Sequence, residues 1–179
     1  ALIRNYSLSN LPGSAAYRIS VKKETHGAAS GFIATGVRAG DTVDVAAPRG
    51  TFHLADGDAP VVLVSAGVGV TPVLSMLRSL CAERHDQPVT FLHYATAPDA
   101  VLFGREIEIL AAGHPTVRVL TVYNEDPTAG DLTGFLDESH LHAADPQWRD
   151  ADVYVCGPAP LMDSVREHYE RAGASHRFH

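Results

Sequence analysis

Hydrophobic and polar residues alternate in the first third of the chain. Every second side chain is apolar over residues 17–22, and residues 42–45 repeat the pattern between turns at 39–41 and 48–50. Strict alternation is typical of a strand with one face on a core and the other in water. Short strands between Gly and Pro turns predict part of a β-barrel or sandwich, with one short helix around residues 29–37.

The pattern changes after Pro60. Residues 61–65 form a continuous apolar, β-branched run, as in a central parallel strand covered on both faces. Thr71 then predicts an N-cap and Pro72 the first turn of a helix. Further strands are expected at 89–94, 117–123 and 152–156, and further helices at 103–112, 132–136 and 160–172. This alternation predicts a doubly wound α/β domain with a parallel sheet.

Composition supports a globular protein and argues against some partners. The 179 residues are 45% hydrophobic and 20% charged, with a net charge of −7. Nucleic acid is not an expected partner, because phosphate binding needs a local excess of cations. The first 57 residues nevertheless carry six cations against four anions, and the remainder eight against 17. This asymmetry indicates two modules with different ligands.

The longest strongly apolar stretch, residues 61–70, is half the length needed to cross a bilayer, and no charged leader precedes an apolar core. No membrane span is therefore expected. The two cysteines, Cys81 and Cys156, have neither disulfide-framework nor zinc-site spacing, which favours a reducing, cytoplasmic location. The ten histidines, including His140 and His142, form no ligand set and are interpreted as scattered surface residues, so no metal site is predicted.

A glycine-rich turn follows the first apolar strand. Gly67 and Gly69 let the backbone turn tightly beside a bulky anion, and the helix starting at Thr71 offers free N–H groups to a pyrophosphate. The usual third glycine of a dehydrogenase fingerprint is replaced by Pro72. A purely structural tight turn remains the alternative at this point.

Two further segments contain residue types suited to cofactors. Cys156, Gly157 and Pro158 end another expected central strand, so they could border the same crevice as Gly67. Cys156 alone is equally explained as a small buried hydrophobe. In the first strand, Arg4 can pair with phosphate, the Tyr6 ring can stack on a heterocycle, and Ser7 can hydrogen-bond a ring atom, although this pattern also fits an ordinary exposed strand.

Four motifs in this order resemble the ferredoxin-NADP reductase superfamily, most closely the reductase modules of flavohaemoglobins and of ferredoxin-fused oxygenase reductases. The resemblance covers essentially the whole chain. It rests on Arg4, Tyr6 and Ser7; then Gly27, Ala28, Ala29 and Ser30; then Gly67, Val68, Gly69, Val70, Thr71 and Pro72; then Cys156, Gly157 and Pro158. It implies a partial antiparallel FAD-binding β-barrel at residues 1–58 and a NAD(P)-binding α/β domain at 59–179.

The resemblance also implies roles in the FAD-binding part. Arg4 would bind the FAD phosphates, Tyr6 would pack on the isoalloxazine, and Ser7 would hydrogen-bond near flavin N5. Val21 and Lys22 would line the FAD strand. The helix opened by Gly27, with the Ser30 hydroxyl, would hold the pyrophosphate.

For the nicotinamide, the resemblance implies that residues 67–72 cradle the dinucleotide, with Thr71 near the flavin edge and Cys156 beside nicotinamide C4. Tyr6, Ser7 and Cys156 are thus the catalytic candidates. Residues 93–104 contain no Lys or Arg to pair with a 2′-phosphate, although Thr96 could donate one hydrogen bond. The lack of a cation favours NADH over NADPH. The implied activity is hydride transfer from nicotinamide to FAD, with electrons passing to a haem or 2Fe-2S partner.

The chain departs from the superfamily pattern at both ends. Superfamily members place half of the FAD barrel before the Arg-x-Tyr-Ser strand, and they end in a further strand of which only Phe178 and His179 are present here. A non-catalytic dinucleotide-binding fragment with an incomplete flavin site is therefore the alternative function. An α/β domain with an unrelated ligand is disfavoured by residues 4–7.

Overall fold

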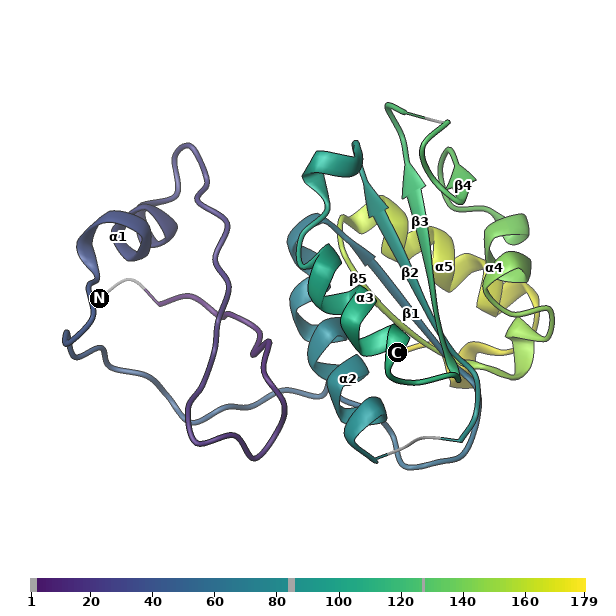
Figure 1. The fold of residues 1–179 in the computed structure, drawn as a ribbon, viewed down its shortest axis with the longest axis horizontal. Helices are drawn as coiled ribbons and strands as arrows, with labels where there is room; N and C mark the ends of the chain where they lie inside the picture. The colour runs from purple at the N-terminus through teal and green to yellow at the C-terminus, as the bar shows by residue number, and fades with distance from the viewer. Residues whose placement is uncertain (1–2, 84–85, 127) are drawn as a thin grey trace.

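The computed structural model describes residues 3–83, 86–126 and 128–179. A five-stranded sheet dominates it, with all paired strands parallel in the order β4-β3-β2-β1-β5 (Figure 1). The strands are β1 (Val61–Ala66), β2 (Val89–Ala95), β3 (Val117–Tyr123), β4 (Leu132–Thr133) and β5 (Asp152–Cys156). The predicted α/β fold is confirmed.

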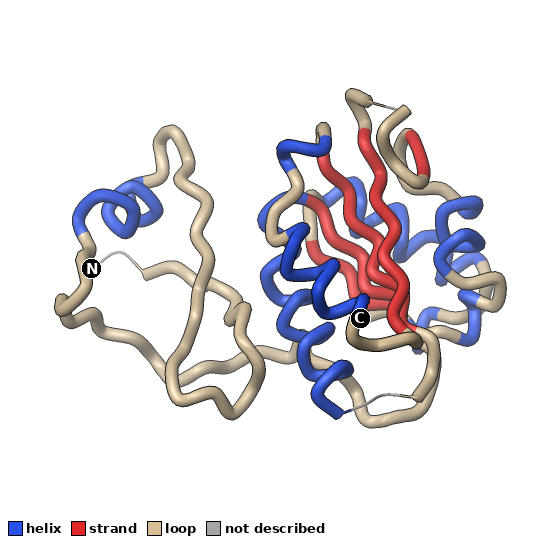
Figure 2. Tube along the Cα trace, viewed as in Figure 1, coloured by secondary structure: helices blue, strands red, loops and turns tan. Residues whose placement is uncertain are grey.

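Helices cover both faces of the sheet, as Figure 2 shows. They are α2 (Val70–Glu83), α3 (Gly104–Ala112), α4 (Glu138–Ala144) and α5 (Ala159–Arg171), with short 3₁₀ turns at Gly67–Gly69, Pro98–Ala100, Trp148–Asp150 and Ser175–Arg177. Alternate residues of β1 point to opposite cores. Leu63 packs with α2 and α3, whereas Val62 and Val64 pack with α4 and α5. Burial on both faces explains why β1 is continuously apolar.

The strand order reverses at β1. After β1 the chain forms β2 on one side, and it returns after α4 to place β5 on the other. Because all these strands are parallel, the segments that follow β1 and β5 emerge at the same edge of the sheet. Such a switch point is where open α/β sheets bind ligands.

Two local predictions in the α/β part are wrong. The helix expected at residues 132–136 is the short strand β4, which pairs with the end of β3, and α4 follows it from Glu138. The Asp137 carboxylate caps α4 by accepting from the N–H groups of Ser139 and His140, and the hydrogen bond from the Ser139 hydroxyl lowers the pKa of Asp137. The cap therefore lies directly after the predicted helix, where the observed helix begins.

Thr71 is not the N-cap of α2. A 3₁₀ turn over Gly67–Gly69 leads directly into the helix at Val70, so Thr71 and Pro72 lie in its first turn. The Thr71 hydroxyl donates to the Val68 carbonyl at 3.2 Å rather than capping an N–H group. Pro72 is compatible with this position because the first-turn N–H groups of a helix have no intrahelical acceptor.

Residues 3–58, here called the N-terminal segment, contain the expected short helix, α1 (Ala28–Gly36), but not the expected strands. Residues 17–22 make only an isolated antiparallel bridge, Leu8 with Ile19, and residues 42–45 are irregular. An alternating strand needs a neighbouring strand to bond its backbone and a core for its apolar face. Among the described residues, neither is available beside 42–45, where Val43 is 53% and Val45 is 74% exposed.

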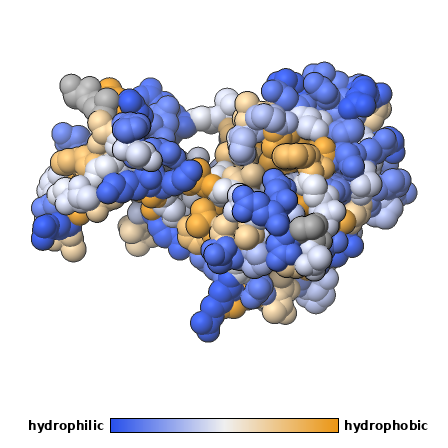
Figure 3. Space-filling model, turned by 90° about the horizontal axis from the view of Figure 1, so that it is seen from above, coloured by the Kyte–Doolittle hydropathy of each residue, from blue (hydrophilic) through white to orange (hydrophobic). Residues whose placement is uncertain are grey.

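Several large apolar side chains of the N-terminal segment are accordingly exposed, and Figure 3 shows hydrophobic and hydrophilic residues mixed on its surface. They are Ile3, Tyr17, Ile19, Phe32, Val43, Val45 and Phe52. Such a concentration of exposed apolar groups marks a surface that normally packs against other protein or a ligand.

Candidate nucleotide-binding site

The two glycine motifs of the α/β part meet at the switch point. Ser65 pairs with Cys156 in the β1–β5 register, so the segments that follow them start side by side. A Cβ placed on Gly69 would lie 2.5 Å from the Cys156 carbonyl carbon and 2.8 Å from the Gly157 nitrogen. Residue 69 therefore has to be glycine for the α2 turn to lie against the end of β5.

Gly67 is required for a different reason. Its φ is +51°, in the left-handed region that L side chains rarely adopt, and a Cβ there would meet no atom within 4 Å. Gly67 and Val68 are exposed, whereas Gly69, Val70, Thr71 and Pro72 are buried. A nucleotide at this edge would thus meet Gly67 and Val68 directly, and the four residues after them form the packed base.

Cys156 is partly buried, and burial raises the pKa of its thiol. The protonated thiol is a weak nucleophile, so this cysteine is suited to shaping the crevice rather than to covalent chemistry. Gly157 packs closely on β1, since a Cβ there would lie 3.2 Å from the Cβ of Ala66. Pro158 precedes α5, whose first turn has no side-chain cap.

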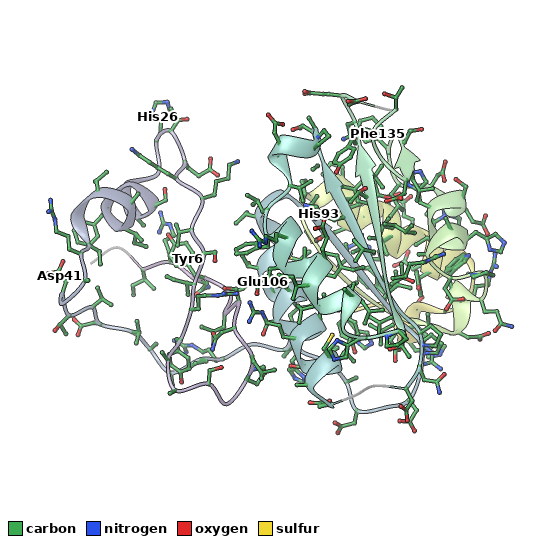
Figure 4. The ribbon with its side chains drawn as sticks, viewed as in Figure 1. Tyr6, His26, Asp41, His93, Glu106 and Phe135 are labelled. Atoms are coloured by element: carbon green, nitrogen blue, oxygen red, sulfur yellow. The ribbon has the colours of Figure 1, made fainter. Side chains whose placement is uncertain are left out.

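The expected FAD residues lie in the irregular N-terminal segment, where Figure 4 labels Tyr6. Tyr6 is partly buried, while Arg4 and Ser7 are exposed, and among the described residues the Arg4 guanidinium donates only to the Ile3 carbonyl, at 2.8 Å. Val21 is partly buried, and exposed Lys22 forms an ion pair with Glu24 at 3.4 Å. These placements leave the Arg4, Tyr6 and Ser7 side chains accessible to a ligand.

Helix α1 begins as the sequence suggests, but the Ser30 hydroxyl, which was expected to hold a pyrophosphate, makes hydrogen bonds within the chain. Its hydroxyl donates to the Gly27 carbonyl at 3.2 Å and accepts from the Glu24 N–H at 3.1 Å, and Ser30 is 7% exposed. The hydroxyl thus closes the loop before the helix. No side chain caps the first turn of α1, so the backbone N–H groups from Ala28 onward are the available anion donors.

Two histidines that were predicted to lie on the surface, His140 and His93, are buried. His140 is 4% exposed; the Tyr94 hydroxyl lies 2.7 Å from its Nδ1, and its Nε2 lies 3.1 Å from the Thr133 carbonyl oxygen. His140 therefore links β2, β4 and α4 inside the fold and is not a surface residue. His142, in contrast, is exposed.

His93 on β2 is also internal, at 1% exposure. Its Nδ1 lies 2.8 Å from the Ser65 hydroxyl on β1, its Nε2 has no partner among the described residues, and burial lowers its pKa to about 4. His93 also forms part of the wall of a cavity of about 390 Å³ between α3 and strands β2 and β3. Its position in an apolar strand was the available signal that it is not a surface residue.

Glu125 lies next to Thr96, the expected hydrogen-bond donor to the nucleotide. Thr96 is exposed just after β2, and its carbonyl accepts from the Glu125 N–H at 2.9 Å, which brings the ends of β2 and β3 together. Glu125 is exposed, and Asp126 follows it. Residues 119–133 contain no Lys or Arg. Glu125 was missed because only the folded sheet places it beside Thr96.

Comparison with known proteins identifies this geometry. The Oxidoreductase NAD-binding domain family matches residues 63–167, which include both glycine motifs. The chain belongs to this family. The resemblance to the ferredoxin-NADP reductase superfamily is confirmed with it.

Similar proteins extend the match to the N-terminal segment. The chain is 39% identical to a flavohemoprotein of Burkholderia sp. (strain TH2), over 95% of this chain and 44% of that protein. The crystal structure of the flavohem-like FAD/NAD-binding domain of nitric oxide dioxygenase from Vibrio cholerae O1 biovar El Tor superposes with a TM-score of 0.87 at 32% identity, over 98% of this chain and 75% of that one.

Phthalate dioxygenase reductase, described as modular for electron transfer from pyridine nucleotides to [2Fe-2S], gives a TM-score of 0.72 at 31% identity, over 92% of this chain and 49% of that one. The chain thus spans less than half of the length of the flavohemoprotein and of this reductase. No described helix is long and apolar enough to cross a membrane, and no group of described His, Cys, Asp or Glu residues is arranged to hold a metal ion.

Proposed function

We propose that the protein is an FAD-dependent NAD(P)H oxidoreductase module, with an FAD-binding part at residues 1–58 and a nicotinamide-binding part at 59–179. The observation that carries the proposal is the close packing of Gly69 against residues 156 and 157 at the switch point of a parallel sheet. The similarity of the chain to a flavohemoprotein and to phthalate dioxygenase reductase supports the proposal.

The residues present fit both cofactors. Gly67 and Val68 leave an exposed backbone for a dinucleotide, and the uncapped first turn of α1 leaves N–H groups for a pyrophosphate. Arg4, with its guanidinium exposed, would neutralise a phosphate charge. When bound, FAD supplies the capacity to accept a hydride and release single electrons.

The protein would contribute to the reaction by positioning the flavin and the nicotinamide. Tyr6 would hold one face of the planar flavin ring, and Ser7 would donate a hydrogen bond at the ring edge. Cys156, neutral because burial raises its pKa, would limit the room beside the nicotinamide without adding charge. Holding the two reacting rings in contact converts an encounter into a step within one complex.

NADH is the proposed reductant. Glu125 lies beside Thr96, and neither segment at this edge, 93–104 or 119–133, contains a cation. A carboxylate accepts hydrogen bonds from ribose hydroxyls, whereas it repels the 2′-phosphate of NADPH. The acceptor of the electrons is proposed to be a haem or 2Fe-2S group, and the location cytoplasmic, in keeping with two free thiols.

Flavin reduction tests the proposal directly. The protein is reconstituted with FAD, the bound-flavin absorbance is recorded, and NADH is added without oxygen. Bleaching of the flavin band is expected. Failure to bind FAD, with affinity for NADH retained, would refute the proposal and support the alternative of a non-catalytic dinucleotide-binding fragment, which the irregular, exposed N-terminal segment favours.

A further inference from the structure

A polar cluster joins the N-terminal segment to helices α2 and α3. At its centre is Glu106 of α3, which Figure 4 shows at the edge of the α/β part that faces the N-terminal segment. Its Oε1 binds Arg78 of α2 and also lies 3.7 Å from Nη2 of Arg18. Among the described residues, the Arg18–Glu106 pair is the one ion pair between residues 3–58 and the rest.

Arg18 connects this cluster to the flavin residues. Its Nε donates to the Ser9 hydroxyl at 3.0 Å and its Nη2 to the Ser9 carbonyl at 2.7 Å, while the Ser9 N–H donates back to the Arg18 carbonyl at 2.9 Å. Ser9 is fully buried and lies two residues after Ser7. A displacement of Arg18 would therefore move the segment that carries Tyr6 and Ser7.

On the other side, the cluster is connected to the nucleotide-binding turn through α2. This helix starts directly after Gly69, and its Ser75 hydroxyl donates to the Asn10 carbonyl at 2.7 Å. Phe103, which precedes α3, has a left-handed φ of 60° and lies under the Arg18 guanidinium at 5.8 Å. A non-glycine residue in this conformation is strained, so the surrounding contacts have to hold it.

Glu106 balances two cations that would otherwise repel each other. The pKa of Arg78 is lowered by burial and by the charge of Arg18, and its Nε has no partner among the described residues. With the carboxylate removed, two guanidinium groups face each other across the boundary between the two parts of the chain. The repulsion would separate α2 from the segment around Ser9.

We propose that Glu106 is a positioning residue for hydride transfer, because it fixes the flavin-binding segment against the helices that carry the nucleotide-binding turn. The inference rests on the proposed function. Hydride transfer needs reacting atoms within about 3–3.5 Å, and a small misplacement of either ring lowers the rate. Glu106 lies outside the predicted cofactor contacts, so its loss should change geometry rather than nucleotide affinity.

Stopped-flow reduction of the FAD-loaded protein by NADH, without oxygen, tests this inference. We expect Glu106→Gln to lower the limiting rate of flavin reduction about three- to tenfold, while the dissociation constant for NADH stays within about twofold. The matched control is Glu108→Gln, on the exposed side of the same helix and without an ion pair to any described residue. It should leave both quantities unchanged.

A second variant separates positioning from folding. Arg18→Gln removes the ion pair between the two parts, together with the Arg18 hydrogen bonds to Ser9, and leaves the pair of Glu106 with Arg78 intact. It should therefore reproduce the loss of rate while the α/β part unfolds at an unchanged temperature. The double variant should be no slower than the slower single variant, because both changes remove the same ion pair and Arg18→Gln also removes the repulsion from Arg78. Equal reduction rates in wild type, Glu106→Gln and Arg18→Gln would overturn the inference, whereas absence of reduction in the wild type would refute the proposed function itself.

Discussion

A single methyl group at residue 69 should separate the two halves of the nucleotide crevice. In Gly69→Ala, the new Cβ would lie 2.5 Å from the Cys156 carbonyl carbon and closer still to its oxygen, whereas ordinary van der Waals contact begins at 3.4 Å. The start of α2 and the end of β5 must therefore move apart by about 1 Å. Both are backbone segments, so no side-chain rotation can relieve the contact.

The size of the effect follows from this displacement. Overpacking of a buried site costs about 1–3 kcal/mol, which for a chain of this length lowers the melting temperature by about 2–12 °C. A misplacement of about 1 Å at a reacting site lowers a rate about 100-fold. We expect loss of this order in the rate of flavin reduction by NADH, measured by anaerobic stopped flow, and weaker NADH binding in a fluorescence titration.

Gly67→Ala is the matched control. Its φ of +51° makes the substitution strained, but no atom lies within 4 Å of the new Cβ, so β1 and β5 stay in contact. It should lower stability by about 1 kcal/mol and weaken NADH binding, because its methyl group would lie at the exposed edge that the nucleotide meets, but the limiting rate of reduction should fall much less than in Gly69→Ala. Wild-type NADH affinity and reduction rate in Gly69→Ala, at temperatures where it is folded, would refute the assignment of this edge as the nucleotide site.

Further predictions concern other residues. Burial lowers the pKa of His93 from 6.5 to about 4, so the free energy of unfolding should be highest above pH 6.5 and fall by about 3 kcal/mol as the pH drops to 4. In denaturant titrations at several pH values, the free energy of unfolding of His93→Leu should depend less on pH. Glu125→Gln should improve binding of NADPH relative to NADH about fivefold, by removing about 1 kcal/mol of repulsion, and an unchanged ratio in titrations would contradict this. Tyr154→Phe removes the hydroxyl oxygen that accepts from the Ala55 N–H at 2.8 Å, and it should cost about 1 kcal/mol in chemical unfolding.

The central sheet could be predicted because its signals are local. A strand such as residues 61–65 is apolar throughout only if both faces are covered, and its neighbours β2 and β5 lie within the same chain. The strand near residue 132 could not be predicted, because two residues carry no periodicity and their pairing with β3 depends on the fold. Burial of His140 depends in the same way on Tyr94, which is distant in sequence.

The candidate site also combines features that are local in the sequence with features that depend on the fold. The two glycines of the turn were predicted as one motif, yet they are needed for different reasons: Gly67 for its backbone angle, and Gly69 for its contact with β5. The first reason belongs to the turn itself. The second exists only because the sheet order places β5 beside β1, which the sequence around residue 69 does not encode.

The irregular N-terminal segment follows from the same reasoning. Its alternating residues specify which side chains share a face, but a strand also needs a partner for its backbone groups. Leu8 with Ile19 and Ser9 with Arg18 find such partners within the segment, and this is the part that the ion pair with Glu106 holds against the α/β part. Where no partner is present among the described residues, as at Val45, the same pattern gives an exposed chain. The proposed flavin residues adjoin the part of the segment that contacts the α/β part, which is why we expect the contact at Glu106 to affect the rate of reduction.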